Sequence, residues 1–238
     1  MELDVEHDGP VTLLTLNRPE KANALSPDLV EALLASVNEA YRDGTRLLVL
    51  SGNGQHFCAG FDFSDFESAS EGELLRRFVR IEQLLQALYH APFAALALAH
   101  GKNFGAGVDL LVACGVRVAA PDTTFRMPGL RFGVQLGTRR LARRIGPEHA
   151  RTMLAASKTV SAAHALSIGL VHRRTARDRW AEDILAERSR ATSLAASAVA
   201  RLNAATAVDT RAEDMADLVA SLVEPGLQDR VRAFRARG

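Results

Sequence analysis

The chain is short of several residue types, and each shortage narrows what the protein can be. Among its 238 residues are only two cysteines, Cys58 and Cys114, whose spacing fits neither a metal-binding pair nor a disulfide framework. We therefore expect free thiols in a reducing compartment and no bound metal. The formal net charge is +1, so the chain lacks the positive field that is typical of binding to nucleic acid or acidic membranes. Neither is expected as a partner.

Long apolar runs are missing as well. None approaches the ~20 residues that a membrane-spanning helix requires. The acidic opening MELDVEHDGP has no apolar core of the kind found in signal peptides, so we expect a cytoplasmic protein. Hydrophobic residues make up 47% of the chain and charged residues 24%, which is ordinary for a globular domain with a sizeable core.

The order of apolar runs and helical repeats predicts an α/β fold. Strands are predicted at residues 11–16, 46–51, 93–99, 116–120 and 171–174. Helices are predicted between them from apolar residues at helical spacing and from capping signals such as Ser26 before Pro27. From Trp180 onward only helices are predicted. We expect an α/β core over residues 1–175 and a helical region over residues 176–238.

Two glycine-bearing turns carry the strongest functional signal. FCAGFDF, residues 57–63, follows the apolar run at 47–50, and HGKNFGAGVDLL, residues 100–111, follows the run at 93–99. Each turn leads from a predicted strand toward a helix, and its small residues let the backbone approach a ligand closely. Two such turns facing each other could aim two backbone N–H groups at one oxygen. That is the layout of an oxyanion hole and indicates chemistry on a carbonyl or thioester.

At these residues the chain resembles the crotonase superfamily, the enoyl-CoA hydratases and isomerases. NRPEKANAL at 17–25 resembles the segment that holds the adenine and ribose of CoA. FCAGFD and HGKNFGAGVDLLVACGVRVAA resemble the two oxyanion turns, and FRMPGLRFGV at 125–134 resembles a third active-site segment. Each motif is weak alone, but together they follow the family's order along nearly the whole chain.

The resemblance implies a spiral of ββα units followed by a helical trimerisation region. It also implies a homotrimer or homohexamer and an acyl-CoA thioester substrate. CoA would belong to the substrate, so no separate cofactor is expected.

The resemblance also assigns roles to individual residues. The amides of Phe61 and Ala106 would form the oxyanion hole, and Asp109 takes the position of the first of two catalytic glutamates. The second glutamate corresponds to Gly129, which has no side chain. The loop between Gly133 and Gly137 is shorter than the family pattern. We infer the following substrate-binding residues: Lys21, Ala22, Ala24, Ala59, Asp62, Phe63, Phe104, Met127, Gly129 and Gln135.

The role of Asp109 has two interpretations. As a catalytic group it could carry a proton between two carbons, as an isomerase requires, or serve both steps of a hydration. As a structural group it could cap a helix, because aspartate is common in a first turn. A helix N-terminus favours the ionised carboxylate. Asp109 would then be a weak base unless burial raises its pKa.

The sequence therefore predicts an acyl-CoA-processing enzyme that stabilises a thioester enolate, with proton transfer by Asp109. Isomerase, thioester hydrolase and decarboxylase chemistry stay open, as does a CoA-binding protein that has lost catalysis with the acid at position 129. His56, His90 and His100 are interpreted as structural and Cys58 as a buried thiol. The arginines at 139, 140, 143 and 144 predict a solvated or subunit-facing surface, with nucleic-acid contact as the weaker alternative.

Overall fold

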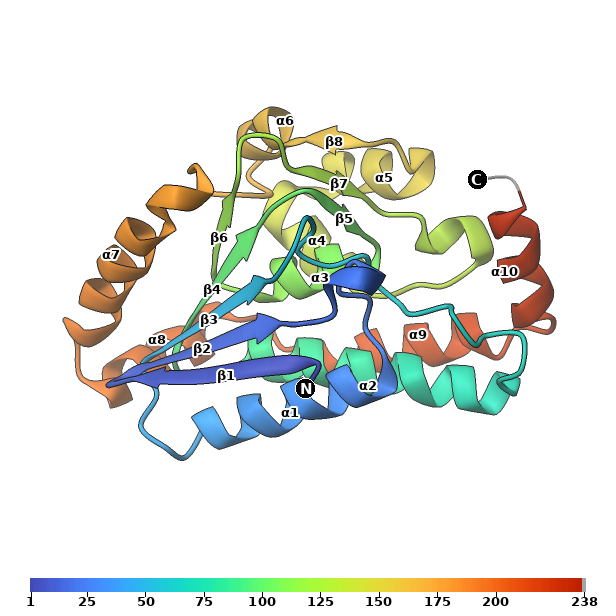
Figure 1. Ribbon diagram of the computed structural model, residues 1–238. Helices are drawn as coiled ribbons and strands as arrows, with labels where there is room; N and C mark the ends of the chain where they lie inside the picture. The colour runs from blue at the N-terminus through green and yellow to red at the C-terminus, as the bar shows by residue number, and fades with distance from the viewer. Residues whose placement is uncertain (237–238) are drawn as a thin grey trace.

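The computed structural model describes residues 1–236 and shows helices packed around one main β-sheet (Figure 1). The sheet has six strands in the order β1-β2-β3-β4-β6-β9. Their bounds are Leu3–Asp8, Val11–Leu16, Leu47–Gly52, Ala94–Ala99, Val116–Ala119 and Arg173–Arg174. β1 and β2 are antiparallel, and all other neighbours in this sheet are parallel. The predicted α/β class is confirmed.

Strand β1 was not among the predicted strands. Its sequence, LDVEHD, is mostly polar, and Leu3 is its one buried residue. β1 pairs only with β2, so it lies at the edge of the sheet, where polar side chains are tolerated because they face water.

A second, smaller sheet joins β5 (Lys102–Phe104), β7 (Thr124–Arg126) and β8 (Val160–Ser161) in that order. Strands this short carry no readable alternation of polar and apolar residues, which is why the sequence did not predict them. One residue, Gly105, separates the end of β5 from the helix that begins at Ala106 within the second glycine turn. The small sheet therefore fixes where that turn lies.

Ten α-helices are assigned within residues 1–236. Those around the core are α1 (Pro27–Ala40), α2 (Glu71–Tyr89), α3 (Ala106–Ala113), α4 (Thr138–Ile145), α5 (Pro147–Ala156) and α6 (Ala162–Ser167). The C-terminal helices are α7 (Trp180–Thr192), α8 (Ala196–Thr206), α9 (Arg211–Leu222) and α10 (Leu227–Arg235). Short 3-10 turns lie at Pro19–Lys21 (η1), Gly129–Phe132 (η2) and Arg177–Arg179 (η3).

Apolar side chains cover both faces of the main sheet. On one face, alternate strand residues such as Val49 and Leu96 pack with Trp180 of α7. On the other face, Leu48 and Leu50 belong to the larger core with α1, α2 and α3. Burial on both faces explains the continuous apolar runs that marked these strands in the sequence.

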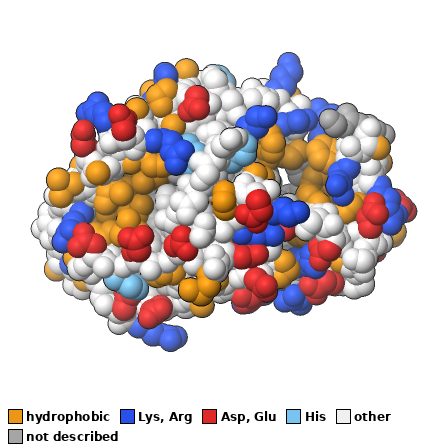
Figure 2. All heavy atoms as spheres, in the orientation of Figure 1, with side chains coloured by type: hydrophobic (Ala, Val, Ile, Leu, Met, Phe, Trp, Pro, Cys, Tyr) orange, Lys and Arg blue, Asp and Glu red, His pale blue; other side chains and the backbone are white. Residues whose placement is uncertain are grey.

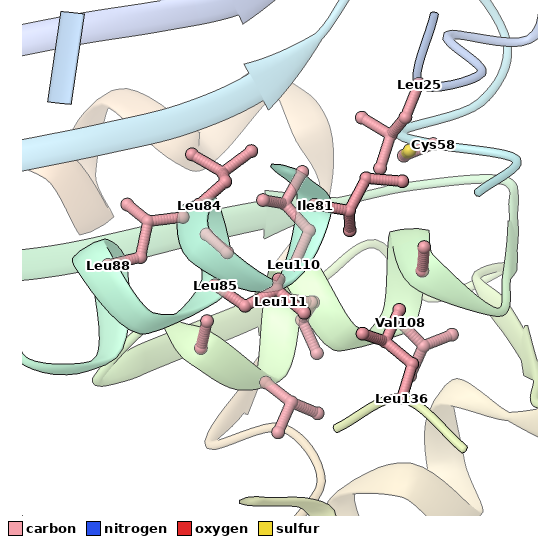
Figure 3. Close-up of a cluster of buried hydrophobic side chains, with 14 of the residues drawn as sticks. Leu25, Cys58, Ile81, Leu84, Leu85, Leu88, Val108, Leu110, Leu111 and Leu136 are labelled. Carbon is pink, nitrogen blue, oxygen red and sulfur yellow. The ribbon is translucent and has the colours of Figure 1, made fainter. Parts of the chain in front are cut away.

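Helices α2 and α3 form the centre of the larger core. Figure 3 shows Leu85 of α2 beside Leu110 and Leu111 of α3, and all three are fully buried. α2 begins at a capping serine, because the Ser70 hydroxyl accepts a hydrogen bond from the amide of Glu73 at 3.1 Å. The core thus holds α3, and with it the second glycine turn, against a long helix with a fixed start.

No helix within residues 1–236 is long and apolar enough to cross a membrane.

Candidate active site

The two glycine turns meet through their backbones. Gly60 has a φ of +86°, and a Cβ placed there would lie 2.3 Å from the carbonyl oxygen of Phe104 and 3.2 Å from the amide nitrogen of Ala106. Only glycine combines this conformation with this approach. The first turn therefore rests directly on the start of α3.

A short parallel pairing with Leu25 turns the amide of Phe61 away from that residue. The Leu25 amide donates to the Gly60 carbonyl at 2.7 Å, and the Asp62 amide donates to the Leu25 carbonyl at 3.4 Å. In parallel pairing the residue between those two groups points its own N–H the other way. The Phe61 N–H donates to no group within residues 1–236, and neither does that of Ala106, the first residue of α3.

A cavity of about 70 Å³ opens beside these amides. Its lining includes Phe61, Ala106 and Asp109, and five more of the inferred residues: Ala59, Phe63, Phe104, Met127 and Gly129. Helix α10 contributes Phe234 to the wall. Figure 2 shows hydrophobic side chains around a hollow near the C-terminal end of the chain. Apart from Asp109 and Thr138, every side chain in the lining is apolar.

Asp109 is the fourth residue of α3 and is only 2% exposed. Its Oδ1 atom has no hydrogen-bond partner within the described chain, and no backbone amide donates to its carboxyl. The capping role is therefore wrong. Burial raises the pKa of Asp109 well above its usual value. The positive charge of Arg140 opposes this rise, and the negative charge of Glu82 adds to it. Burial outweighs the helix N-terminus that the sequence suggested would keep this carboxyl ionised.

Gly129 lies in the cavity wall with no room for a side chain. A Cβ there would come within 2.9 Å of the Val134 carbonyl oxygen, a backbone atom that cannot rotate away. The Val134 amide in turn donates to the Gly129 carbonyl at 3.0 Å. The short loop thus closes on Gly129 and occupies the direction that a side chain would take.

Other inferred residues lie outside the cavity lining. The side-chain amide of Gln135 donates to Asp217 of α9 at 3.2 Å, and its backbone amide donates to the Ser221 hydroxyl. Asp62 accepts a hydrogen bond from Arg18 at 2.9 Å and another from the amide of Ser64. Both side chains are engaged within the chain, so neither reaches the cavity.

The segment that carries Lys21, Ala22 and Ala24 is tied to the first turn. The Ala59 amide donates to the Ala22 carbonyl at 2.9 Å, and Arg18 donates to the Ala24 carbonyl at 2.7 Å. Lys21 is exposed. The segment therefore borders the first turn without lining the cavity.

The arginine cluster is only partly exposed: Arg143 is exposed and Arg140 is buried. Arg140 is 2% exposed and donates to Glu82, at 2.8 Å through Nη1, and to Asp214 at 3.3 Å. Arg139 pairs with Asp214 and Asp217. Arg143 and Arg144 donate to backbone carbonyls. The prediction of a solvated face is wrong for Arg140, and the nucleic-acid alternative loses its basis because these charges bind the chain's own groups.

Two relevant residues were missed. Glu82 is completely buried, and the available signal was an acid within the apolar stripe of α2. Thr138 lines the cavity with a buried hydroxyl that has no partner within the described chain. Its signal was a hydroxyl residue directly after the glycine that precedes α4.

His100 and Cys58 have features of structural residues. Burial lowers the pKa of His100 to about 4, and its Nε2 lies 3.1 Å from the Gly54 carbonyl. Burial raises the pKa of the Cys58 thiol to about 12, so it is not a ready nucleophile. Neither residue lines the cavity.

The two turns that the motifs marked touch each other, and the acid of the second motif, Asp109, lies beside them in one cavity. The model of the enoyl-CoA hydratase/isomerase family matches residues 6–224, and the chain belongs to this family. The resemblance inferred from the motifs is confirmed.

Similar proteins come from several bacteria. A probable enoyl-CoA hydratase of Mycobacterium tuberculosis is 34% identical over 166 residues, which cover 68% of this chain and 66% of the relative. The crystal structure of a putative enoyl-CoA hydratase/isomerase from Bordetella parapertussis is 44% identical, covers all of both chains and has a TM-score of 0.99. An enoyl-CoA hydratase structure from Mycobacterium smegmatis is 28% identical, with a TM-score of 0.81 over 100% of this chain and 97% of that one.

Proposed function

We propose that the protein acts on acyl-CoA thioesters by moving a proton at the carbon next to the thioester carbonyl. The amides of Phe61 and Ala106 would hold the carbonyl oxygen as it becomes an enolate oxygen, and Asp109 would transfer the proton. One observation carries this proposal: two amides without partners within the described chain and one buried carboxyl without a partner border the same cavity.

The oxyanion interaction would supply much of the rate enhancement. Removing one such donor costs about 2.7–4 kcal/mol in well-studied enzymes. Here both donors are backbone amides, and the touching turns hold them so that little reorganisation is needed. The apolar lining strengthens their attraction to a developing negative charge, because water does not screen it.

Asp109 suits proton transfer because burial in the apolar cavity raises its pKa. A carboxyl whose pKa is raised by burial is a stronger base once ionised, and a positioned acid or base contributes about 10²–10⁴-fold to rate. Moving a proton between two carbons, as in double-bond isomerisation, needs a single carboxyl group. The cavity lining contains a single one.

The remaining parts of the proposal concern binding and assembly. The segment at 17–25 would hold the CoA nucleotide, with Lys21 available to a phosphate, and the apolar lining would take an apolar acyl group. No cofactor would be needed beyond the CoA of the substrate. Assembly as a homotrimer or homohexamer and a cytoplasmic location complete the proposal.

Proton exchange tests this function without requiring knowledge of the final product. Saturated acyl-CoAs from butyryl to decanoyl would be incubated with the protein in D₂O, and deuterium at the α-carbon would be followed by mass spectrometry. We expect exchange that requires Asp109 and is lost in Asp109→Asn. CoA binding without exchange on any chain length would overturn the proposal in favour of a CoA-binding protein that has lost catalysis.

A further inference from the structure

Thr138 presents a hydroxyl in the cavity that nothing in the fold accounts for. Its Oγ1 atom is buried and has no hydrogen-bond partner within the described chain. It is the first residue of α4, whose N-cap is Gly137, and no side chain caps that helix. A buried hydroxyl without a partner lowers stability relative to an apolar group of the same shape. A structural role therefore does not explain it.

The same corner of the cavity contains the unpaired atom of Asp109. A Cβ on Gly137 would lie 2.1 Å from Asp109 Oδ1, so the carboxyl rests against the residue that precedes Thr138. Asp109 and Thr138 are the two polar side chains of the lining, and each has a buried oxygen without a partner within residues 1–236. The rest of the wall cannot form hydrogen bonds through its side chains. Two such oxygens at neighbouring positions are suited to share one polar atom.

Resting on the proposed function, we propose that Thr138 is a second catalytic residue, which holds one reacting oxygen together with Asp109. That oxygen belongs to a water molecule that adds to an unsaturated acyl thioester, or to the hydroxyl group that leaves in the reverse direction. A water needs roughly 10–15 Å³ of cavity and two or more polar partners. The cavity of about 70 Å³ provides the space, and these two side chains provide the partners.

The step balances with a single carboxyl group. Ionised Asp109 takes one proton from the water while the water oxygen bonds to C3 and the electrons of the C2–C3 double bond pass to the thioester oxygen as an enolate. Asp109 then delivers that proton to C2 and returns to its ionised form. Thr138 orients the water through its hydroxyl and exchanges no proton. A hydroxyl from α4 thus does the orienting work for which Gly129 offers no side chain.

The test separates this role from the proposed function. Hydration of crotonyl-CoA and of its longer-chain homologues would be compared with α-carbon deuterium exchange in the corresponding saturated acyl-CoAs. The variants are Thr138→Val, which keeps the shape and removes the hydroxyl, and Thr138→Ser, which keeps the hydroxyl. We expect Thr138→Val to reduce kcat for hydration at least about tenfold, a loss of about 1.4 kcal/mol of transition-state stabilisation. Thr138→Ser should stay near the wild type.

Exchange provides the internal control, because it involves no water addition. Thr138→Val should lower hydration several-fold more than it lowers α-carbon exchange, and it should melt at the same temperature as the wild type or higher. Equal hydration by wild type and Thr138→Val would overturn the proposal, and so would exchange without any hydration in the wild type. A lower melting temperature with parallel losses of exchange and hydration would also overturn it, because it would identify a structural residue. Absence of exchange in the wild type would instead remove the proposed function itself.

Discussion

Two buried acids in this protein differ in their hydrogen bonding. Glu82 of α2 is completely buried and accepts hydrogen bonds from Arg140 and from Gln86, at 2.9 Å. Asp109 of α3 is 2% exposed and accepts none from the described chain. Both acids contribute to the electrostatic environment of Arg140. The Arg140 guanidinium pairs with Glu82, which connects helices. Asp109 borders the cavity without a partner in the described chain and is therefore available to a ligand.

The contrast separates a structural role from a chemical one. The Glu82–Arg140–Asp214 group connects α2, α4 and α9, and removing one partner would leave an uncompensated charge in the core. Burial disfavours the ionised form of Asp109, so the fold gains nothing from that ionisation. Substitutions should therefore affect stability at one acid and activity at the other.

The largest effect is expected from Asp109→Asn. Asparagine keeps the shape of the side chain but cannot take or give a proton, so α-carbon exchange and any turnover should fall about 10²–10⁴-fold. Steady-state assays across acyl-CoA chain lengths measure this. The control is Glu148→Gln on the exposed surface of α5, which should leave activity intact. Wild-type activity in Asp109→Asn would show that the unpaired acid has no chemical role.

Arg140→Met should lower the free energy of unfolding by about 3–5 kcal/mol. The substitution leaves Glu82 and Asp214 buried without their shared partner. Urea denaturation with a tryptophan or circular-dichroism readout measures the loss. A change under 1 kcal/mol would mean that the ion pairs do not connect the helices as described.

Gly137→Ala should displace Asp109. The new Cβ would meet the Asp109 carboxyl at 2.1 Å, and the residue would also have to hold a φ of +63°. We expect activity to fall at least about tenfold and stability to fall by about 1–3 kcal/mol. Gly226→Ala isolates the backbone cost, because Gly226 is also a left-handed residue before a helix, with a φ of +79°, and the nearest atom to its new Cβ is 3.9 Å away. Equal activity in the two variants would argue against the contact with Asp109.

The pH dependence of stability should report the burial of Asp109. Because the pKa of Asp109 is raised in the folded protein, its contribution to stability is fully present below its unfolded pKa and is lost as pH rises through the folded value. As pH rises from about 4, the ordinary pKa of an aspartate, through the raised pKa of the folded protein, the wild type should lose stability relative to Asp109→Asn. Activity that needs the ionised base should rise over the same interval. A constant stability difference between the two proteins would show that burial does not raise this pKa.

The smallest effect is expected from Arg139→Met, which is the matched control for Arg140. Arg139 pairs with Asp214 and Asp217, but 37% of its side chain is exposed, so solvent screens the interaction. The free energy of unfolding should fall by at most about 1 kcal/mol. A loss as large as that from Arg140→Met would mean that burial does not set the difference between these neighbours.

Sequence reasoning identified the parts of the fold that depend on local patterns. The predicted strand at 11–16 matches β2, and the region predicted to be helical from Trp180 onward contains α7 to α10. Strand-forming residues and helical spacing are properties of residues close together in the sequence. The edge strand β1 and the three short strands of the second sheet escaped it. β1 is mostly polar, and the three short strands pair with segments that are distant in the sequence.

The site shows the same limit. The glycine turns and Asp109 were visible because each motif is continuous, and the structure places them around one cavity. Arg140 was interpreted as a surface residue because its partner Glu82 lies 58 positions away and belongs to another helix. Gln135 was assigned to the substrate because the sequence shows a loop but not the α9 residues it faces. Long-range polar pairing cannot be read from neighbours in sequence.

The packing of Gly129 against the Val134 carbonyl has a consequence for redesign. A glutamate inserted by one substitution would push the main chain of the shortened loop aside rather than reach into the cavity. A second carboxylate therefore requires a longer loop between residues 129 and 137 as well as the new side chain. Single-site libraries at this position should yield misfolded or inactive enzymes, whereas loop grafts open the route.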